Sequence, residues 1–353
     1  MDGSPKKTKK FLYEVSVIRP TIIFLLVVLH SFTKITADGW GQRINDYPLV
    51  TPYRWFCWLI SGFRIETIAL IAGYVFAYQS LDLNRSYKLW PFVWKKFKRL
   101  IIPMLVFGLV YYFCFLYNPG AFEMKSFVVN WLSGCGHLWF LPMLFWCFLA
   151  IWGIDHFKLS SWPTLLILAT ISVIRILPLP LGFGRLSHFL FFVYAGYFLW
   201  TKREWLMRHW MNNATISGLG IAYIALVILI HTVLITPKPE MSLMQRGVVI
   251  LIIGTLKLLM SCCGIMALYL FVCQTTTKKN YKPKSWLISA SNDCYGVYVY
   301  HQFILIAMYF YSPLVQRVNP LIVPWIGIVV AFFISLLMTK LTLKTKVGRL
   351  LIG

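Results

Sequence analysis

The chain is 353 residues long, enough for two soluble domains, but 59% of its residues are hydrophobic and only 13% are charged. Soluble domains average roughly 45–50% and about 25% for these classes, so the composition excludes a soluble protein. A net charge of +23 would suggest a nucleic-acid partner in a soluble chain. Here the cations lie in short loops beside long apolar blocks, which is how membrane topology is marked, so no nucleic acid is expected.

In chain order, ten apolar blocks approach the length of membrane-spanning helices, since about 20 residues at ~1.5 Å each cross a ~30 Å hydrocarbon core. They cover 15–36, 55–79, 100–117, 136–154, 163–180, 186–200, 214–236, 247–273, 286–311 and 323–343. The block at 186–200 is short and also suits a partial span. Runs of this length lack the period-two alternation of a membrane barrel. The predicted fold class is therefore an all-α polytopic bundle of about ten transmembrane helices in the lipid bilayer.

The distribution of basic residues predicts the topology of this bundle. Most of the 34 Lys and Arg residues fall on one side of the membrane if the N-terminus is cytoplasmic and the number of spans is even. Both termini are then cytoplasmic: 1–14 forms a basic tail, 15–345 a single transmembrane bundle, and 346–353 a cytoplasmic end. The first block lacks a signal-peptide cleavage site and is interpreted as an anchor. The eight cysteines include no C-x-x-C pair, so no metal site is expected.

The first block carries two ionisable residues separated by ten apolar or small ones, Arg19-PTIIFLLVVL-His30. Such side chains are costly inside a membrane span, so each needs a partner or a task. Eleven residues at about 100° and ~1.5 Å each place the two on nearly the same helix face, about 16 Å apart. Taken singly, Arg19 is also explained as an inner anchor and His30 as hydrogen-bonded packing. As a pair they suggest a groove that holds an anion at the cytoplasmic mouth and performs proton chemistry beyond the midplane.

The second block contains Arg64 and Glu66, which point about 200° apart on a regular helix and cannot pair directly. Either the helix is broken there, or each residue has a partner on another helix. Gly73, further along the block, is expected to permit close helix packing. Two other cations within blocks, Arg175 and Lys257, have no partner that the sequence identifies.

A basic cluster, Lys95-Lys96-Phe97-Lys98-Arg99, leads into the third block. It is explained either as a topology signal or as a phosphate cradle that faces the same compartment as Arg19.

Two further segments combine histidine with aromatic residues. The fourth block opens with Gly136-His137-Leu-Trp139, where the tryptophan is also typical of an interfacial belt. The ninth block contains Tyr298 and His301, which are three residues apart on one helix face and are placed to bind each other or a ligand.

Together these segments resemble the acyltransferase 3 family of integral-membrane O-acyltransferases over nearly the whole chain. The resemblance lies in the R-x10-H motif at Arg19–His30, the segment Phe63–Tyr74, the pair Lys96–Arg99 before a Pro-containing span, Gly136–Leu141, and Tyr298–His301, in the family's order. It implies transfer of an acyl group, by default acetyl, from cytoplasmic acetyl-CoA to a hydroxyl of a cell-envelope sugar or polysaccharide. It also implies a multi-pass protein of a bacterial inner membrane that uses acyl-CoA as a co-substrate and holds no permanent cofactor.

The residues and the resemblance lead to one hypothesis for the site. The expected coenzyme A phosphate ligands are Arg19, Lys96 and Arg99. His30 is expected to act either as general base toward the acceptor hydroxyl or as an acyl carrier. The candidate substrate-binding residues are Arg64, Glu66, His137, Trp139, Tyr298 and His301.

Two other classes of function compete with the acyltransferase. A proton-coupled transporter of a sugar or small molecule would also bury Arg, Glu and His, although such proteins commonly contain internal repeats and none is visible here. A structural or regulatory membrane protein would leave the Arg19–His30 spacing without a reason.

Overall fold

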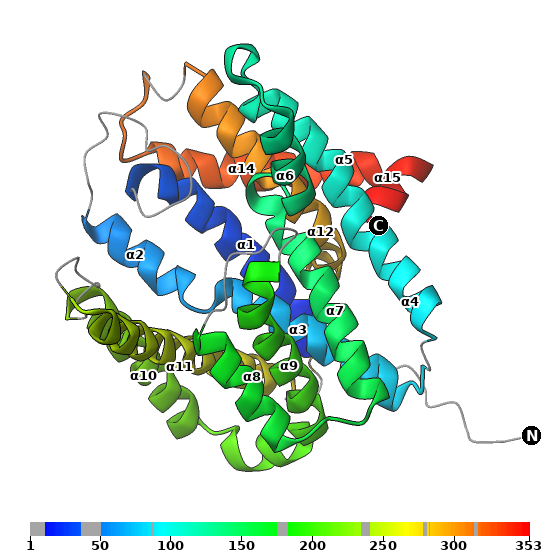
Figure 1. Cartoon of the computed structure of the whole chain (residues 1–353), viewed down its shortest axis with the longest axis vertical. Coiled ribbons are helices and arrows are strands. Elements are labelled where there is room, and N and C mark those ends of the chain that lie inside the picture. The colour runs from blue at the N-terminus through cyan, green and yellow to red at the C-terminus, as the bar shows by residue number, and fades with distance from the viewer. Residues whose placement is uncertain are drawn as a thin grey trace, which may run out of the picture.

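The computed structural model describes residues 11–36, 51–85, 88–174, 183–233, 241–277, 281, 283–313 and 317–353, and every regular element in these ranges is a helix (Figure 1). The predicted tail at 1–14 and the second half of the block at 163–180 lie largely outside the described residues. The helices are α1 (Tyr13–Thr36), α2 (Thr51–Ser61), α3 (Arg64–Ala77), η1 (Tyr78–Asp82), α4 (Leu89–Lys96), η2 (Phe97–Ile101), α5 (Ile102–Tyr111), η3 (Tyr112–Leu116), η4 (Pro119–Ala121), α6 (Met124–Ser133), η5 (Gly136–Trp139), α7 (Phe140–His156), α8 (Trp162–Ile174), α9 (Phe183–Trp210), α10 (Asn213–Thr232), α11 (Leu243–Thr276), α12 (Ser285–Ile306), η6 (Ala307–Tyr311), α14 (Val323–Leu343) and α15 (Lys346–Ile352).

Among the described residues, seven helical stretches are long and apolar enough to cross a membrane. They are Tyr13–Phe32, Thr51–Asp82, Leu89–Leu116, Gly136–His156, Asn213–Thr232, Met244–Thr276 and Val323–Leu343. The helices α9 and α12 are also long, with 28 and 22 residues, but less apolar, and α8 is a shorter apolar helix of 13 residues. Each of the ten predicted blocks thus contains a helix, and the predicted class, an all-helical polytopic membrane bundle, is confirmed.

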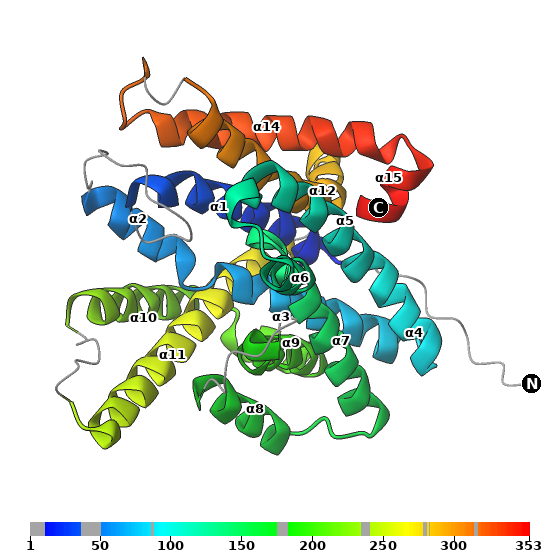
Figure 2. The same ribbon diagram turned by 45° about the horizontal axis from the view of Figure 1, so that its top comes forward.

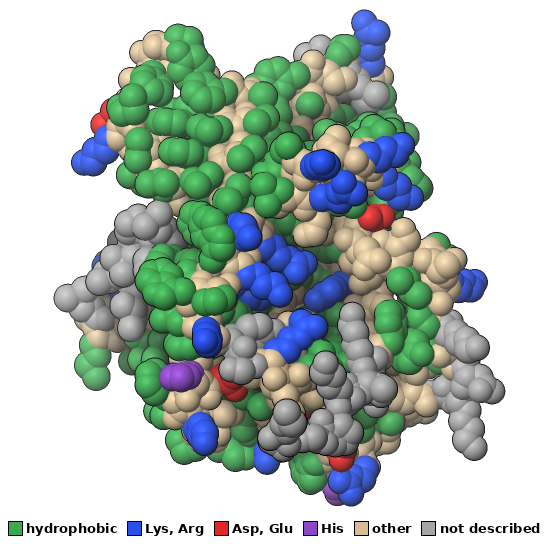
Figure 3. Space-filling view, turned by 90° about the vertical axis from the view of Figure 1, so that its right-hand side faces the viewer, with side chains coloured by type: hydrophobic (Ala, Val, Ile, Leu, Met, Phe, Trp, Pro, Cys, Tyr) green, Lys and Arg blue, Asp and Glu red, His purple; other side chains and the backbone are tan. Residues whose placement is uncertain are grey.

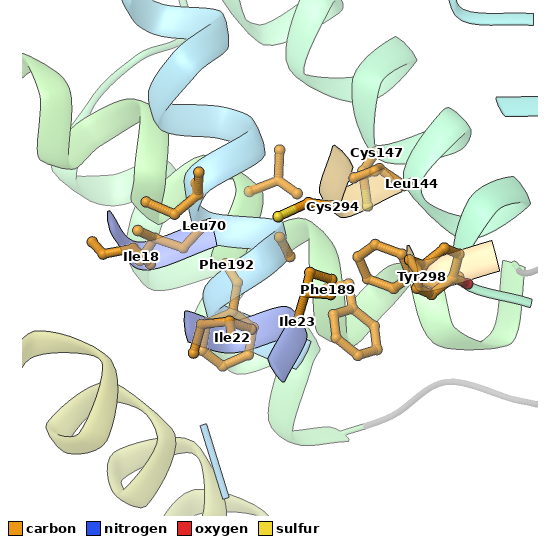
Figure 4. Packing of buried hydrophobic residues seen from close by; sticks show 14 of the residues in the cluster. Ile18, Ile22, Ile23, Leu70, Leu144, Cys147, Phe189, Phe192, Cys294 and Tyr298 are labelled. Carbon is orange, nitrogen blue, oxygen red and sulfur yellow. The ribbon is translucent and has the colours of Figure 1, made fainter. Parts of the chain in front are cut away.

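The centre of the bundle is formed by α1, α3, α9 and α12 (Figures 1 and 2). α14 packs on α12 and α1 at one side, and α10 and α11 pair with each other at the opposite side. The core joins aliphatic residues of α1 to aromatic and sulfur-containing residues of the other helices. Figure 4 shows Ile18, Ile22 and Ile23 of α1 near Leu70 of α3, Phe189 and Phe192 of α9, Leu144 and Cys147 of α7, and Cys294 and Tyr298 of α12.

α3 and α9 approach each other more closely than ordinary side chains allow. A Cβ added at Gly73 would lie 1.7 Å from the carbonyl oxygen of Val193, and one added at Gly196 would lie 1.9 Å from that of Leu70. Each helix therefore presents a glycine to the other's backbone, as small residues do where membrane helices pack tightly. The structure agrees with the packing role expected for Gly73.

Candidate active site

Three histidines from distant parts of the sequence meet in the interior of the bundle. His30 of α1 and His301 of α12 are 7% and 0% exposed, and His137 of η5 is 4% exposed. His30 Nδ1 lies 2.8 Å from His301 Nε2. The two ring planes are inclined by only 13°, with centroids 5.0 Å apart, which suits a hydrogen bond lying in both rings. The rings of His137 and His301 are also neighbours, with centroids 5.1 Å apart.

The partners of His301 fix which nitrogens carry protons. His301 Nδ1 lies 2.7 Å from the carbonyl oxygen of Tyr298 and 3.1 Å from that of Val297. A carbonyl only accepts, so Nδ1 of His301 carries a hydrogen, and in the neutral ring Nε2 is the acceptor. His30 must then donate its Nδ1 hydrogen to His301. The neutral His30 ring consequently holds its lone pair on Nε2, the form that acts as a base or nucleophile.

His137 and Tyr298 connect η5 to α12 around this pair. His137 Nε2 donates to the carbonyl oxygen of Val299 over 2.9 Å, and the Tyr298 hydroxyl donates to the carbonyl oxygen of His137 over 2.5 Å. His137 Nδ1 is buried and has no hydrogen-bond partner among the described residues. Tyr298 therefore contacts His301 through its backbone carbonyl, while its hydroxyl holds the turn that carries His137.

The turn before His137 depends on two glycines. Gly134 and Gly136 have φ of 83° and 57°, in the left-handed region that favours glycine. A Cβ at Gly136 would also lie 2.6 Å from the hydroxyl oxygen of Tyr111. This explains why the histidine of the Gly-His-Leu-Trp segment directly follows a glycine.

The predicted second span is broken beside this centre. α2 ends at Ser61 and α3 begins at Arg64, after a turn. A helix break at membrane depth frees carbonyl groups that need donors from elsewhere. Here the Tyr223 hydroxyl of α10 donates to the carbonyl of Leu59, and Ser261 Oγ of α11 donates to that of Gly62 over 2.6 Å.

Arg64 and Glu66 both lie on α3 after the break, and their positions about 200° apart on this helix place them in different environments. Arg64 is 4% exposed, lies within electrostatic range of His301 and Glu66, and has no hydrogen-bond partner for Nε or Nη1 among the described residues. Glu66 Oε1 lies 3.5 Å from His188 Nε2 of α9. The first alternative holds, with the break just before Arg64, and the second holds for Glu66 alone, whose partner lies on α9.

Trp139 has a specific partner rather than only an interfacial position. The Arg185 guanidinium of α9 lies 3.8 Å from the centroid of its ring, a close cation–π contact. Trp139 follows His137 by two residues in η5, and Arg185 is also within electrostatic range of Tyr298, so this pair lies near the histidines.

The three cations predicted to bind phosphate lie at another part of the bundle. The side chains of Arg19 and Arg99 are exposed and within electrostatic range of each other. The Lys96 ammonium is partly buried, 3.2 Å from the centroid of the Phe148 ring. In the described part of the chain, none of the three forms an ion pair with an acidic residue. Figure 3 shows Lys and Arg side chains gathered in a hollow of the face that lies on the right of Figure 1.

Arg99 is held in place by local and long-range structure. It lies in η2, a π-helical segment between α4 and α5, and its carbonyl accepts a hydrogen bond from the Tyr295 hydroxyl of α12 over 2.9 Å. Such π-helical insertions occur frequently at functional sites. On α1, which runs unbroken past both residues, Arg19 and His30 keep the helical spacing that the sequence predicted.

The structure also brings two polar residues near Glu66 that the sequence analysis did not single out. His188 and Ser172 adjoin Glu66, with Ser172 Oγ 2.9 Å from His188 Nδ1. His188 could have been identified from the sequence, because it lies inside the apolar block at 186–200, where an ionisable side chain needs a partner or a task. Of the two unassigned cations, Arg175 lies outside the described residues. Lys257 lies on α11, where its carbonyl accepts a hydrogen bond from Ser261 over 3.0 Å.

Comparison with protein families matches residues 12–340 to a family model described as an acyltransferase domain, that of the acyltransferase 3 family. The match covers far more than half of the chain and includes both the histidine cluster and the three exposed or partly buried cations. The comparisons with curated proteins and with solved structures gave no match.

Proposed function

The chain belongs to the acyltransferase 3 family of membrane O-acyltransferases, and on that premise we propose that it moves an acetyl group from cytoplasmic acetyl-CoA to a hydroxyl of a cell-envelope sugar or polysaccharide. The observation that carries the proposal is the hydrogen bond from His30 to His301, because it leaves the His30 lone pair on Nε2. The proposal includes a bacterial inner-membrane location with both termini in the cytoplasm.

The donor is bound, in this proposal, at the mouth that carries Arg19, Lys96 and Arg99. Coenzyme A bears several phosphate charges, and guanidinium groups bind phosphate through paired charge-assisted hydrogen bonds. The extended pantetheine arm would then follow α1 from Arg19 toward His30, about 16 Å along the helix axis. The Lys96 ammonium packs on the Phe148 ring and is not on the open surface. In this proposal it attracts the phosphates through its positive charge without a direct contact.

The proton transfers follow from the tautomer of His30. His30 Nε2 accepts the proton of the acceptor hydroxyl as that oxygen attacks the thioester carbonyl, and the resulting imidazolium keeps its Nδ1–H hydrogen bond to His301. When the carbonyl re-forms, the C–S bond breaks and the thiolate of coenzyme A takes the proton from Nε2. The same lone pair also permits an acyl-imidazole intermediate: Nε2 attacks the thioester carbonyl and the C–S bond breaks to release the thiolate of coenzyme A. The acceptor hydroxyl then attacks the acyl carbon, the C–N bond breaks, and the hydroxyl proton passes to the thiolate.

The test uses the purified protein in lipid nanodiscs and in cell membranes, as wild type and His30→Ala, with acetyl-CoA labelled on the acetyl group. Label is followed into lipid, glycan and water-soluble fractions, and coenzyme A binding is measured in parallel. The expected result is transfer that is lost in His30→Ala while binding and expression persist. Wild-type transfer by His30→Ala would refute the role of His30. If folded wild-type protein neither binds coenzyme A nor turns over acetyl-CoA, the donor assignment fails and a transporter becomes the better interpretation.

A further inference from the structure

A second polar cluster adjoins the histidine pair and joins three helices. Glu66 of α3 faces His188 of α9 across 3.5 Å, and His188 Nδ1 lies 2.9 Å from Ser172 Oγ of α8. Arg64, two residues before Glu66, lies within electrostatic range of both Glu66 and His301. Arg64 therefore interacts electrostatically with both this cluster and the proposed reaction centre.

Several polar atoms of the cluster are buried without a partner. In the described part of the chain these are Nε and Nη1 of Arg64, Oε2 of Glu66 and Oγ of the neighbouring Ser187. An unpaired polar atom is costly in a dry interior, and an unpaired charge at membrane depth more so. Arg64 is almost wholly buried, whereas the side chains of Glu66 and His188 are 16% and 15% exposed. Parts of the Glu66 and His188 side chains thus reach the surface, and the unpaired oxygen and nitrogen atoms lie buried behind them with hydrogen-bonding capacity unused.

The charges of the unpaired atoms restrict what fits. A phosphate or carboxylate would be attracted by Arg64 but repelled by Glu66, and a cationic ligand would meet the reverse. A hydroxyl group both donates and accepts, so neighbouring hydroxyls of one molecule can donate to Glu66 Oε2 and accept from the Arg64 guanidinium. A neutral ligand with several hydroxyls satisfies both groups without bringing a charge into the membrane.

The other two members of the cluster orient Glu66. His188 Nε2 lies 3.5 Å from Glu66 Oε1, and a carboxylate only accepts, so this contact favours the neutral tautomer with its hydrogen on Nε2 and with Nδ1 accepting from Ser172 Oγ, 2.9 Å away. His188 faces Oε1 of the carboxylate, whereas Oε2 has no hydrogen-bond partner among the described residues. His188 and Ser172 are accordingly positioning residues, and the ligand contacts fall to Glu66 and Arg64.

We propose that Arg64 and Glu66, oriented by His188 and Ser172, form the acceptor subsite, which holds uncharged hydroxyls of the sugar beside the hydroxyl that His30 deprotonates. The inference rests on the proposed acyl transfer. It adds which residues bind the acceptor and predicts that this site prefers an uncharged sugar ring.

The experiment uses the full chain in nanodiscs with labelled acetyl-CoA and three probe acceptors of one ring shape: glucose, glucose 6-phosphate and glucosamine. Wild type should acetylate glucose with at least about tenfold higher kcat/KM than either charged analogue, since each of these brings a charge that one buried group opposes. Glu66→Gln should raise KM for glucose about tenfold or more, and Ser172→Ala should raise it several-fold, because each loses or misorients a hydrogen bond to a charged group. The dissociation constant of coenzyme A should not change in either variant.

Glu123→Gln, on an exposed segment before α6, is the matched control and should behave as wild type. Ser172→Ala removes only a hydroxyl and keeps the test available if Glu66→Gln does not fold. The proposal is overturned if both variants keep the wild-type KM for glucose, if they weaken coenzyme A binding instead, or if a charged analogue is the better acceptor. The proposal is also overturned if the wild-type enzyme acetylates envelope material but acetylates none of the three sugars. Absence of His30-dependent turnover together with absence of coenzyme A binding would instead refute the proposed function itself.

Discussion

The hydrogen bond between His30 and His301 makes a quantitative prediction for two substitutions at His301. His301→Leu fills a similar volume in a site with no exposed surface, but it removes the acceptor of the His30 Nδ1 hydrogen. His30 then loses both the partner that selects its tautomer and the partner that stabilises its imidazolium form. His301→Gln keeps an acceptor oxygen on a side chain of comparable reach and should restore part of the loss.

The size of the effect follows from the charge that His30 gains in the transition state. A hydrogen bond to an ionised group contributes about 1.5–3 kcal/mol, and each 1.4 kcal/mol is a factor of ten in rate, so kcat should fall about 10- to 150-fold in His301→Leu. KM for acetyl-CoA should stay close to that of wild type, because the cations at Arg19 and Arg99 are untouched.

The assay is steady-state transfer of labelled acetyl in nanodiscs, with coenzyme A binding as the check that each variant is folded. His301→Gln should lie between wild type and His301→Leu. A His301→Leu enzyme with the wild-type kcat would refute the reasoning. An equal loss of kcat in His301→Leu and His301→Gln would also refute it, because the hydrogen-bond acceptor would then have no effect on the rate.

Two further predictions concern packing and the donor site. Gly73→Ala places a Cβ 1.7 Å from the carbonyl oxygen of Val193 and should lower the free energy of unfolding by several kcal/mol or prevent folding. Gly218→Ala, with nothing within 4 Å of the new Cβ, should change it by no more than about 1 kcal/mol, and similar unfolding temperatures for the two would contradict the close α3–α9 contact. Arg19→Ala and Arg99→Ala should each raise KM for acetyl-CoA about tenfold or more through lost phosphate contacts, with kcat at saturation nearly kept. The increase should be smaller for a donor that lacks the 3′-phosphate, and an equal effect on both donors would argue against contact with that phosphate.

The sequence predicted the helices and the Arg19–His30 spacing because both depend on residues close together in the chain. An apolar block becomes a helix in lipid since its backbone groups have no other partners, and helix geometry sets the distance between two residues on it. The pairing of His30 with His301 joins residues 271 positions apart, and only the packing of α1 against α12 brings them together. No local pattern encodes such a contact.

The break between α2 and α3 was foreseen only as one of two alternatives, for a related reason. The residues around Gly62 and Phe63 do not include a proline that would force it. The freed carbonyls are satisfied by hydroxyls of Tyr223 and Ser261, about 160 and 200 residues away, so the break is stable only in the folded bundle. Ser172 was missed because a serine in an apolar helix carries no signal until its neighbour is known.

The glycine contact between α3 and α9 has a mechanical consequence. Glu66 and His188 sit on these two helices, and at Gly73 and Gly196 the backbones touch with no side chain between them that could compress or change rotamer. Closely packed backbones transmit displacement rather than absorb it, so the parts of α3 and α9 around these glycines are expected to move together. A conformational change that admits a bulky acceptor is therefore expected in helices other than α3 and α9. The α10–α11 pair reaches the break before Arg64 through the hydroxyls of Tyr223 and Ser261, so a displacement there is resisted by two hydrogen bonds, whereas a displacement at Gly73 and Gly196 is resisted by direct backbone contact.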